Sequence, residues 1–332
     1  MMGVRGGLDM TSVSDRSVLL LKPRGFCAGV VRAIDIVELA LQAYGPPIYV
    51  RKEIVHNRNV VRELASRGAV FVDSVDEVPS GARLVFSAHG VAPSVRAVAA
   101  ARNLRVIDAT CPLVTKVHLE AIRFAKAHCT ILLVGHRDHC EVIGTVGEAP
   151  AQTIVVSSPE EAESVQVPPG SVAYLTQTTL SLDEANSIID VLKRRFPSIQ
   201  APPAKDICYA TENRQMAVKE IVRNADLLLV VGSQNSSNSR RMVEVGQQRG
   251  LPGYLIDDES EIVWAWLENA RNVAVSAGAS APESLVQRVV RRLNSMGFKR
   301  VVEVEAIEEN VHFPLPPELQ GVQPLTQISA SP

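Results

Sequence analysis

Short apolar runs alternate with segments of helical period along most of the 332-residue chain. Runs rich in Val, Ile and Leu predict strands, and the clearest of them lie at 18–21, 48–50, 84–86, 131–134, 172–175, 227–231 and 273–275. Between these runs, apolar residues recur three or four positions apart, which is typical of helices that bury one face. Strands that alternate with helices favour mostly parallel sheets, so the pattern predicts an α/β protein.

Three cysteines mark a weak internal repeat. Cys27, Cys111 and Cys208 are 84 and 97 residues apart, and each follows a plausible strand and precedes a helical pattern. Further along, each unit has an acidic stretch between two strands, at 72–77, 158–161 and 256–261. We therefore expect three related α/β lobes in a pseudo-threefold arrangement, with the three cysteines brought together at the axis.

The repeat also predicts where the lobes begin and end. We expect a loose tail over residues 1–15 and lobes over 16–111, 112–207 and 208–300, followed by a C-terminal arm and tail over 301–332. The two chain ends lack apolar periodicity, which is typical of segments outside a packed core.

Composition and charge narrow the class of protein. Hydrophobic residues make up 46% and charged residues 21%, as in soluble globular proteins. The net charge of −2 argues against a nucleic-acid binder whose affinity rests on a basic surface. No apolar run approaches the ~18 residues of a membrane span, and the N-terminal sequence does not resemble a secretory signal. Five widely spaced cysteines do not predict a disulfide framework. We therefore expect a protein of the reducing cytoplasm, without membrane or nucleic-acid partners.

The three repeated cysteines are candidate metal ligands. Each would begin a helix, where the helix dipole favours the thiolate. The chain has no C-x-x-C pair, and widely separated cysteines that converge suit a cubane iron–sulfur cluster better than a compact zinc site. A 4Fe–4S cluster normally takes four cysteines, so three ligands would leave one iron open to a substrate. Cys129 precedes an apolar run, and we expect it to be structural.

Polar loops follow the predicted strands in all three units. Ligands of open α/β sheets bind at the carboxyl ends of the strands. Six loops at such positions are rich in His, Ser, Thr and Asn, at 53–57, 87–90, 136–141, 176–179, 232–239 and 277–282. These donors, with the N-termini of the following helices, predict an anion site. Each residue alone could be a structural histidine or a helix cap, and recurrence in three units is what favours a site. His118 and His128 are expected on the surface.

The motifs that bind nucleotide cofactors are absent from the sequence. Neither G-x-G-x-x-G after a strand nor G-x-x-x-x-G-K-[ST] occurs, so tightly held NAD, FAD or ATP is not expected. If the protein is a redox enzyme, its electrons would arrive from a partner through the cluster.

From about residue 18 to about residue 319, the chain resembles the 4-hydroxy-3-methylbut-2-enyl diphosphate reductases, which complete the methylerythritol phosphate route to isoprenoids. The resemblance rests on the 232–239 loop and on PRGFCAGV at 23–30, IVHN at 54–57, SAHGV at 87–91, DATCP at 108–112, TQTTL at 176–180, DICYAT at 206–211 and AGASAP at 277–282.

This resemblance implies a cofactor, a substrate and a set of site residues. Cys27, Cys111 and Cys208 would hold a central 4Fe–4S cluster whose open iron binds the substrate hydroxyl. The diphosphate would lie among His56, His89, His139, Ser236, Ser237, Asn238 and Ser280. Thr178 would hydrogen-bond near the hydroxyl with Gln177 beside it, and Glu141 would supply protons.

The resemblance also implies the reaction. A two-electron, two-proton reductive dehydroxylation would give isopentenyl diphosphate and dimethylallyl diphosphate. Reduced flavodoxin or ferredoxin would donate the electrons, and the enzyme would be a monomer or a homodimer.

One position departs from the family pattern. The family usually has His-Pro-Glu where this chain has His139, Cys140 and Glu141. Cysteine relaxes the backbone that proline would restrict, and it adds a thiol near the expected site. In an extended segment the side chains of His139 and Glu141 would share a face, so His139 would bridge Glu141 to a phosphate. Glu53, expected to face away from His56, and Asp138 are the other candidate acids.

Two alternatives use the same three cysteines. An open-iron hydro-lyase acting on another phosphorylated substrate would need no net electrons. A non-enzymatic iron–sulfur sensor would need a readout element such as a basic recognition helix, and the sequence shows none.

Overall fold

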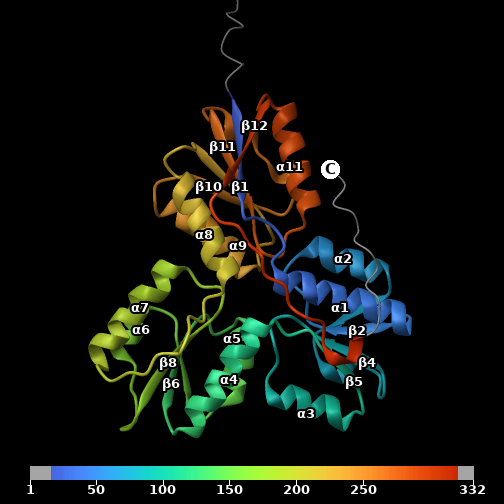
Figure 1. Ribbon diagram of the computed structural model, residues 1–332, viewed down its shortest axis with the longest axis vertical. Coiled ribbons are helices and arrows are strands. Elements are labelled where there is room, and N and C mark those ends of the chain that lie inside the picture. Colours follow the sequence, from blue (N-terminus) through green and yellow to red (C-terminus); the bar gives the residue numbers. More distant parts are fainter. Residues whose placement is uncertain (1–15, 321–332) are drawn as a thin grey trace, which may run out of the picture.

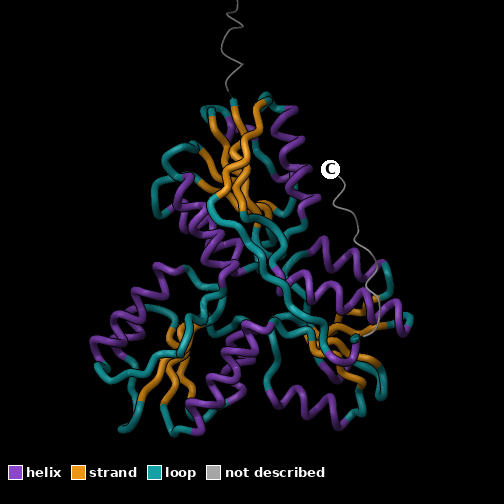
Figure 2. The backbone as a smooth tube through the Cα atoms, in the orientation of Figure 1, coloured by secondary structure: helices purple, strands orange, loops and turns teal. Residues whose placement is uncertain are grey.

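The computed structural model describes residues 16–320 and shows three lobes around a common centre (Figure 1). Each lobe has its own small sheet with helices packed beside it, and loops from all three lobes approach the middle (Figure 2). The tail expected over residues 1–15 lies outside the described residues, as does the part of the C-terminal arm and tail beyond residue 320. The three-lobed α/β architecture is confirmed, and every pairing between the named strands is parallel.

The first lobe contains a four-stranded sheet in the order β3-β2-β4-β5. Its strands are β2 (Ile48–Arg51), β3 (Ala69–Val72), β4 (Arg83–Phe86) and β5 (Arg105–Asp108). Its helices are α1 (Ala28–Tyr44), α2 (Arg58–Ser66), the 3-10 turn η1 (Val75–Glu77) and α3 (Pro93–Ala101). Ile36 of α1 packs with Val50 and Ile107 of the sheet in one buried core.

The second lobe contains a three-stranded sheet in the order β7-β6-β8. Its strands are β6 (Thr130–Val134), β7 (Thr153–Val156) and β8 (Val172–Thr176). Its helices are α4 (Pro112–Lys126), α5 (Cys140–Glu148), α6 (Pro159–Ser164) and α7 (Leu182–Arg195). A single parallel bridge from Ala173 to Gln200 takes the place of a fourth strand.

The third lobe contains a five-stranded sheet in the order β10-β9-β11-β1-β12. Its strands are β1 (Ser17–Lys22), β9 (Leu227–Val231), β10 (Gly253–Ile256), β11 (Asn272–Ala277) and β12 (Arg300–Glu305). Its helices are α8 (Tyr209–Ile221), α9 (Ser237–Gln247), the 3-10 turn η2 (Glu259–Glu261), α10 (Trp264–Leu267) and α11 (Glu283–Ser295). The seven predicted strands are confirmed as β1, β2, β4, β6, β8, β9 and β11.

Strand β1 contradicts the predicted boundary of the first lobe at residue 16. It pairs with β11 and β12, so the N-terminal strand belongs to the third lobe. It takes the fourth place in that sheet, as β5 does in the first lobe. The reason is apolar burial: Val18 and Leu20 pack in one core cluster with Leu229 and Val275. Local patterning shows that 18–21 is a strand, but not which sheet accepts it.

Each repeated cysteine lies where the chain crosses from one lobe to the next. β1 of the third lobe leads to Cys27 and α1 of the first lobe, and β5 of the first lobe leads to Cys111 and α4 of the second. From Gln200 in the second lobe the chain leads to Cys208 and α8 of the third. The threefold arrangement therefore brings the three crossings to the centre.

The acidic stretches of the repeat cap short helical turns. Glu77 accepts a hydrogen bond from the backbone N–H of Ser74, Glu161 from that of Ser157, and Glu261 from that of Asp257. This reciprocal capping satisfies backbone donors at each turn. These three glutamates are thus structural caps.

A C-terminal arm after β12 returns to the first lobe and ends in the 3-10 turn η3 (Pro317–Leu319). Leu319 is buried in the core that contains α1. The carbonyl oxygen of Pro314 accepts a hydrogen bond from the Arg32 guanidinium at 2.7 Å. Across the same described residues, none of the helices is both long and apolar enough to cross a membrane.

Candidate active site

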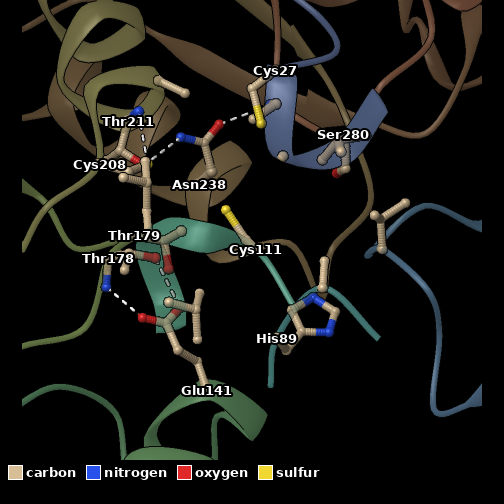
Figure 3. A pocket seen from close by; sticks show the side chains of 18 of the residues that line it. Cys27, His89, Cys111, Glu141, Thr178, Thr179, Cys208, Thr211, Asn238 and Ser280 are labelled. Carbon is tan, nitrogen blue, oxygen red and sulfur yellow. Dashed lines mark hydrogen bonds between the residues drawn. The ribbon is translucent and has the colours of Figure 1, made fainter. Parts of the chain in front are cut away.

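The three repeated cysteines line one central pocket (Figure 3). Cys27, Cys111 and Cys208 are the N-cap residues of α1, α4 and α8. A Cβ atom at Gly29 would lie 2.7 Å from Cys111 Sγ and 3.9 Å from Cys27 Sγ. Glycine is thus needed for the two thiols to approach each other across α1. All five cysteines of the chain are free.

Burial opposes ionisation of these thiols. It raises the pKa of Cys111 to about 12 and that of Cys208 to about 11, and the neighbouring cysteines add to both shifts. The helix N-termini therefore do not produce thiolates by themselves, contrary to expectation, because loss of hydration outweighs the dipole. Three free thiols that line one pocket fit a centre that holds a thiophilic metal. The positive charge of the metal would stabilise the thiolate form, which burial disfavours.

Glu141 is a buried carboxyl group on the second-lobe side of the pocket. It accepts hydrogen bonds from the backbone N–H of Thr178 at 2.6 Å and from the Thr178 hydroxyl at 2.9 Å (Figure 3). Burial raises the pKa of Glu141 to about 7, although both bonds from Thr178 act in the opposite direction. A carboxyl group in this state can hold a proton near neutral pH.

The segment containing His139 and Glu141 is not extended, contrary to expectation. His139 is the N-cap of α5, and its Nδ1 accepts a hydrogen bond of 3.2 Å from the backbone N–H of Glu141. In the neutral ring, this bond leaves the proton on Nε2. The imidazole therefore contacts the backbone of Glu141 rather than its carboxylate.

Three histidines form a cluster beside Glu141. The rings of His56 and His89 stack with centroids 4.0 Å apart, and the ring of His139 lies edge-on to both. Burial lowers the pKa of His139 to about 3 and holds that of His89 well below its usual value. Without a ligand, these two imidazoles are therefore neutral near pH 7.

Glu53 contacts His56, where the sequence led us to expect that it would face away. Its carboxylate lies 3.1 Å from His56 Nδ1 and accepts a hydrogen bond of 2.7 Å from the Asn235 side chain. These hydrogen bonds outweigh burial and lower the pKa of Glu53. An ionised Glu53 orients the imidazole, so Nδ1 carries a proton and Nε2 faces away from Glu53.

The third lobe supplies hydroxyl and amide groups. Ser236 is the N-cap of α9, and the Ser237 hydroxyl donates to the carbonyl oxygen of Thr179 at 3.0 Å. Asn238 donates to Thr211 Oγ1 and accepts from the backbone N–H of Ala279 (Figure 3). The Ser280 hydroxyl donates to the carbonyl oxygen of His56. These bonds fix the loops against one another around the start of α9.

All twelve predicted site residues line this one pocket. Their roles stay predictions, since the structure shows only that the residues meet. Gln177 is buried behind the pocket, where its side chain donates to Thr179 and accepts from the backbone N–H of His136. Asp138 is exposed and does not line this pocket.

His118 was wrongly expected on the surface. It is 5% exposed, and its Nδ1 lies 2.8 Å from Glu148. It faces inward because α4 packs against α5, where a Cβ at Gly144 would lie 3.3 Å from its ring. His128 is exposed as expected, and Cys129 is buried in the core of the second lobe.

Sequence reasoning missed Phe313 as a pocket residue. It lies in the C-terminal arm, whose position depends on the return of the chain to the first lobe, and no local pattern marks it. Tyr209 and Thr211 also line the pocket, and their place in the Cys208 motif could have indicated this. The Tyr209 hydroxyl accepts a hydrogen bond from the backbone N–H of Ala28, which joins two of the cysteine helices.

Three lobes with parallel sheets, arranged around a central pocket that three helix-capping cysteines line, define the class of this α/β protein. The LytB protein family matches residues 18–294, and the chain belongs to this family.

The chain is similar to proteins named 4-hydroxy-3-methylbut-2-enyl diphosphate reductase. It is 58% identical to that of Acidothermus cellulolyticus over 307 residues, which cover 92% of this chain and 90% of the relative. It is 54% identical to that of Leifsonia xyli over 94% of this chain and 93% of the relative. The solved E-1-hydroxy-2-methyl-but-2-enyl-4-diphosphate reductase of Plasmodium falciparum superimposes with a TM-score of 0.90 at 40% identity, covering 92% of this chain and 97% of that one.

Proposed function

We propose that this protein reduces 4-hydroxy-3-methylbut-2-enyl diphosphate to isopentenyl diphosphate and dimethylallyl diphosphate. The C–O bond of the substrate hydroxyl breaks, two electrons and two protons enter, and water leaves. The observation that carries this proposal is the meeting of three capping cysteines, a buried carboxyl group and a histidine cluster in one pocket. The names of the relatives supply the substrate.

Cys27, Cys111 and Cys208 would hold a 4Fe–4S cluster. The fit rests on three free thiols that share one pocket and on the closeness of two sulfurs across Gly29. When bound, such a cluster supplies electrons and an open iron that polarises the C–O bond. Reduced flavodoxin or ferredoxin in the cytoplasm would provide the two electrons.

The diphosphate would bind among loops of all three lobes. Imidazole N–H groups of His89, His139 and a protonated His56 would donate from one side, and the first turn of α9 with Ser280 from the other. A helix N-terminus attracts anions because its first N–H groups lack partners in the helix. An anion also favours protonated imidazole, so diphosphate binding would raise the pKa of His139 from its low value.

Glu141 would be the proton donor. Its place beside Thr178, its burial and its capacity to hold a proton near neutral pH support this role. The Thr178 hydroxyl would hold the carboxyl group in place, next to the reacting carbon. His139 contacts only the backbone of Glu141, so it would position α5 and bind phosphate rather than pass protons to the carboxylate.

Turnover by the purified, cluster-containing protein tests this function. Under anaerobic conditions with a strong chemical reductant, we expect both five-carbon diphosphates as products, and no turnover when the reductant is omitted. Turnover without reductant would indicate a hydro-lyase instead. A protein that bound zinc in place of iron and sulfide and left the substrate unchanged would contradict the proposal.

A further inference from the structure

Cys140 completes a second group of metal-ligating atoms beside the pocket, apart from the three capping cysteines. Ligand atoms of His56, His89 and Cys140 lie within 4.8 Å of one another. The thiol of Cys140 is 3.7 Å from His56 Nε2. The two histidines follow β2 and β4 of the first lobe, whereas Cys140 is the first residue of α5 in the second lobe. Three segments from two lobes therefore place one sulfur and two imidazoles together.

The separation between Cys140 Sγ and His56 Nε2 is close to that of a tetrahedral zinc site. With Zn–N bonds of about 2.0–2.1 Å and a Zn–S bond of about 2.3 Å, neighbouring ligand atoms lie roughly 3.3–3.6 Å apart. The observed separation of 3.7 Å between Cys140 Sγ and His56 Nε2 needs only a few tenths of an ångström of adjustment. Two nitrogens and one sulfur would leave a fourth position open to water or an anion.

Neighbouring groups hydrogen-bond to Nδ1 of both imidazoles, whose stacked rings must splay apart for both Nε2 atoms to face one ion. The Glu53 carboxylate lies against His56 Nδ1, so the lone pair of His56 Nε2 faces Cys140. Ser87 Oγ lies 3.2 Å from His89 Nδ1, which leaves His89 Nε2 free to coordinate. In zinc sites, the ring nitrogen of a ligating histidine that does not bind the metal usually forms a hydrogen bond to a carboxylate or another oxygen atom.

Solvent can reach this group from outside the central pocket. His56 and Cys140 also line a second, wider pocket whose lining includes Glu53, Asp73 and Asp138. The last two carboxylates are exposed. The same lining holds Lys52, Arg137, Arg240 and Arg241, so the acidic groups are offset by basic ones. The outer pocket still offers an entry path that does not cross the three capping cysteines.

We propose that His56, His89 and Cys140 bind a thiophilic divalent cation of the zinc class. The ion occupies the part of the pocket where these histidines would hold the diphosphate. Metal and diphosphate therefore compete, and the enzyme is inhibited by thiophilic metals. This competition rests on the proposed function, whereas the metal site itself does not.

Zinc binding to the cluster-containing protein tests the site directly. Titration against a chromophoric chelator is expected to show one Zn²⁺ per chain with the iron content unchanged. Zinc-edge X-ray absorption is expected to show one sulfur and two nitrogen ligands. Cys140→Ala and Cys140→Ser should each weaken Zn²⁺ binding at least tenfold, because Ser keeps the size but is a poor zinc ligand. The matched control is Cys129→Ser, which removes a buried thiol elsewhere in the second lobe and should bind Zn²⁺ like the wild type.

Other results would overturn the metal site. Zinc affinity unchanged in both Cys140 variants would show that the thiol is not a ligand. Zinc bound by several sulfurs with loss of iron would place the ion at the three capping cysteines instead. Inorganic diphosphate then separates the two proposals. Diphosphate also chelates Zn²⁺ in solution, so its effect on the protein is compared with its effect on the chromophoric chelator alone. If it weakens Zn²⁺ binding to the protein beyond that chelation, the shared site is supported. If Zn²⁺ binds through Cys140 and diphosphate has no effect, the metal site stands and the proposed diphosphate position is wrong.

Discussion

Thr178 donates both its backbone N–H and its hydroxyl to the carboxyl group of Glu141, at 2.6 and 2.9 Å. Glu141 lies at the start of α5, whereas Thr178 follows β8, so two carboxyl-end loops of one sheet fix one functional group. Both bonds favour the charged carboxylate, yet burial still raises the pKa of Glu141 to about 7. The pair therefore combines a fixed position with a proton that is available near neutral pH.

Replacing Glu141 with Gln tests the proposed acid. The amide keeps the shape of the side chain but cannot donate the proton, so turnover should fall roughly 100- to 10,000-fold. Iron content and substrate binding should be retained. The measurement is the steady-state rate under chemical reductant, with a spectroscopic substrate titration. The control Asp138→Asn alters an exposed carboxylate of the neighbouring loop and should leave the rate unchanged. Near-normal turnover of Glu141→Gln with intact iron content would move the acid role elsewhere.

Single Cys→Ser variants test the cluster ligands. Substituting Cys27, Cys111 or Cys208 should lower iron and sulfide content and abolish turnover, because serine is a poor ligand for iron–sulfur clusters. Cys129→Ser should retain both, since this thiol is buried among apolar side chains of the second lobe. The measurement is the iron and sulfide content of each variant after anaerobic purification. Loss of the cluster in Cys129→Ser together with retention in Cys208→Ser would refute the threefold assignment.

Gly278→Ala tests how closely the third-lobe loops must pack. An added Cβ would lie 1.9 Å from Ser239 Oγ, and Ser239 is fully buried. The start of α9 must then move, and it would lose hydrogen bonds to the diphosphate worth about 1.5–3 kcal/mol each. We expect KM to rise roughly tenfold or more with iron content unchanged. Gly253→Ala serves as control, because its Cβ would meet its nearest neighbour at 3.4 Å. An unaltered KM in Gly278→Ala would show that the loops do not bind the diphosphate.

Arg214→Met tests whether the buried Arg214 side chain stabilises the contact between α8, the Gly25 loop and the C-terminal arm. The fully buried guanidinium donates to the carbonyl oxygens of Ala210 and Gly25 and pairs with Glu309 of the C-terminal arm. Removing it takes the cation from the half-buried Glu309, which keeps only the Asn213 amide as a side-chain partner, and takes the guanidinium from the Gly25 carbonyl group, at a cost of about 3–5 kcal/mol. The thermal unfolding midpoint should fall by several degrees. Arg194→Met, which alters an exposed ion pair with Glu163, should change it little. Equal midpoints for the two variants would contradict this role for Arg214.

His118 predicts a pH dependence of stability. Burial lowers its pKa despite Glu148 and Asp108, while Arg96 acts in the same direction as burial. A histidine whose pKa is lowered on folding contributes stability that is present above its unfolded pKa, about 6.5, and lost as pH falls below it.

The His118→Asn variant isolates this effect, since Asn can still donate to Glu148 but does not titrate. Between pH 8 and 5.5, the unfolding midpoint of the wild type should fall further than that of His118→Asn. Exposed His128→Asn should follow the wild type. Parallel curves for wild type and His118→Asn would show that His118 does not titrate on unfolding.

The sequence by itself determined the class of elements and the kind of chemistry. Apolar runs of four or five residues with helical patterns between them specify parallel α/β lobes, because each element must bury its own apolar face. The spacing of three cysteines before helices indicated a shared centre, and the structure places them in one pocket. Polar loops recurred after the predicted strands of all three units. Because the carboxyl ends of parallel strands lie at the same edge of a sheet, these loops were expected to lie close together.

Only the tertiary structure decided which segments meet. The pairing of β1 with β11, the burial of His118 and the presence of Phe313 in the pocket all depend on contacts between residues far apart in sequence. The same holds for the contact of Glu53 with His56 and for the closeness of Cys140 to that imidazole. Local patterns record which face of an element is apolar, but burial, hydrogen bonding and pKa values are set by what lies opposite that face once the three lobes have closed around the centre.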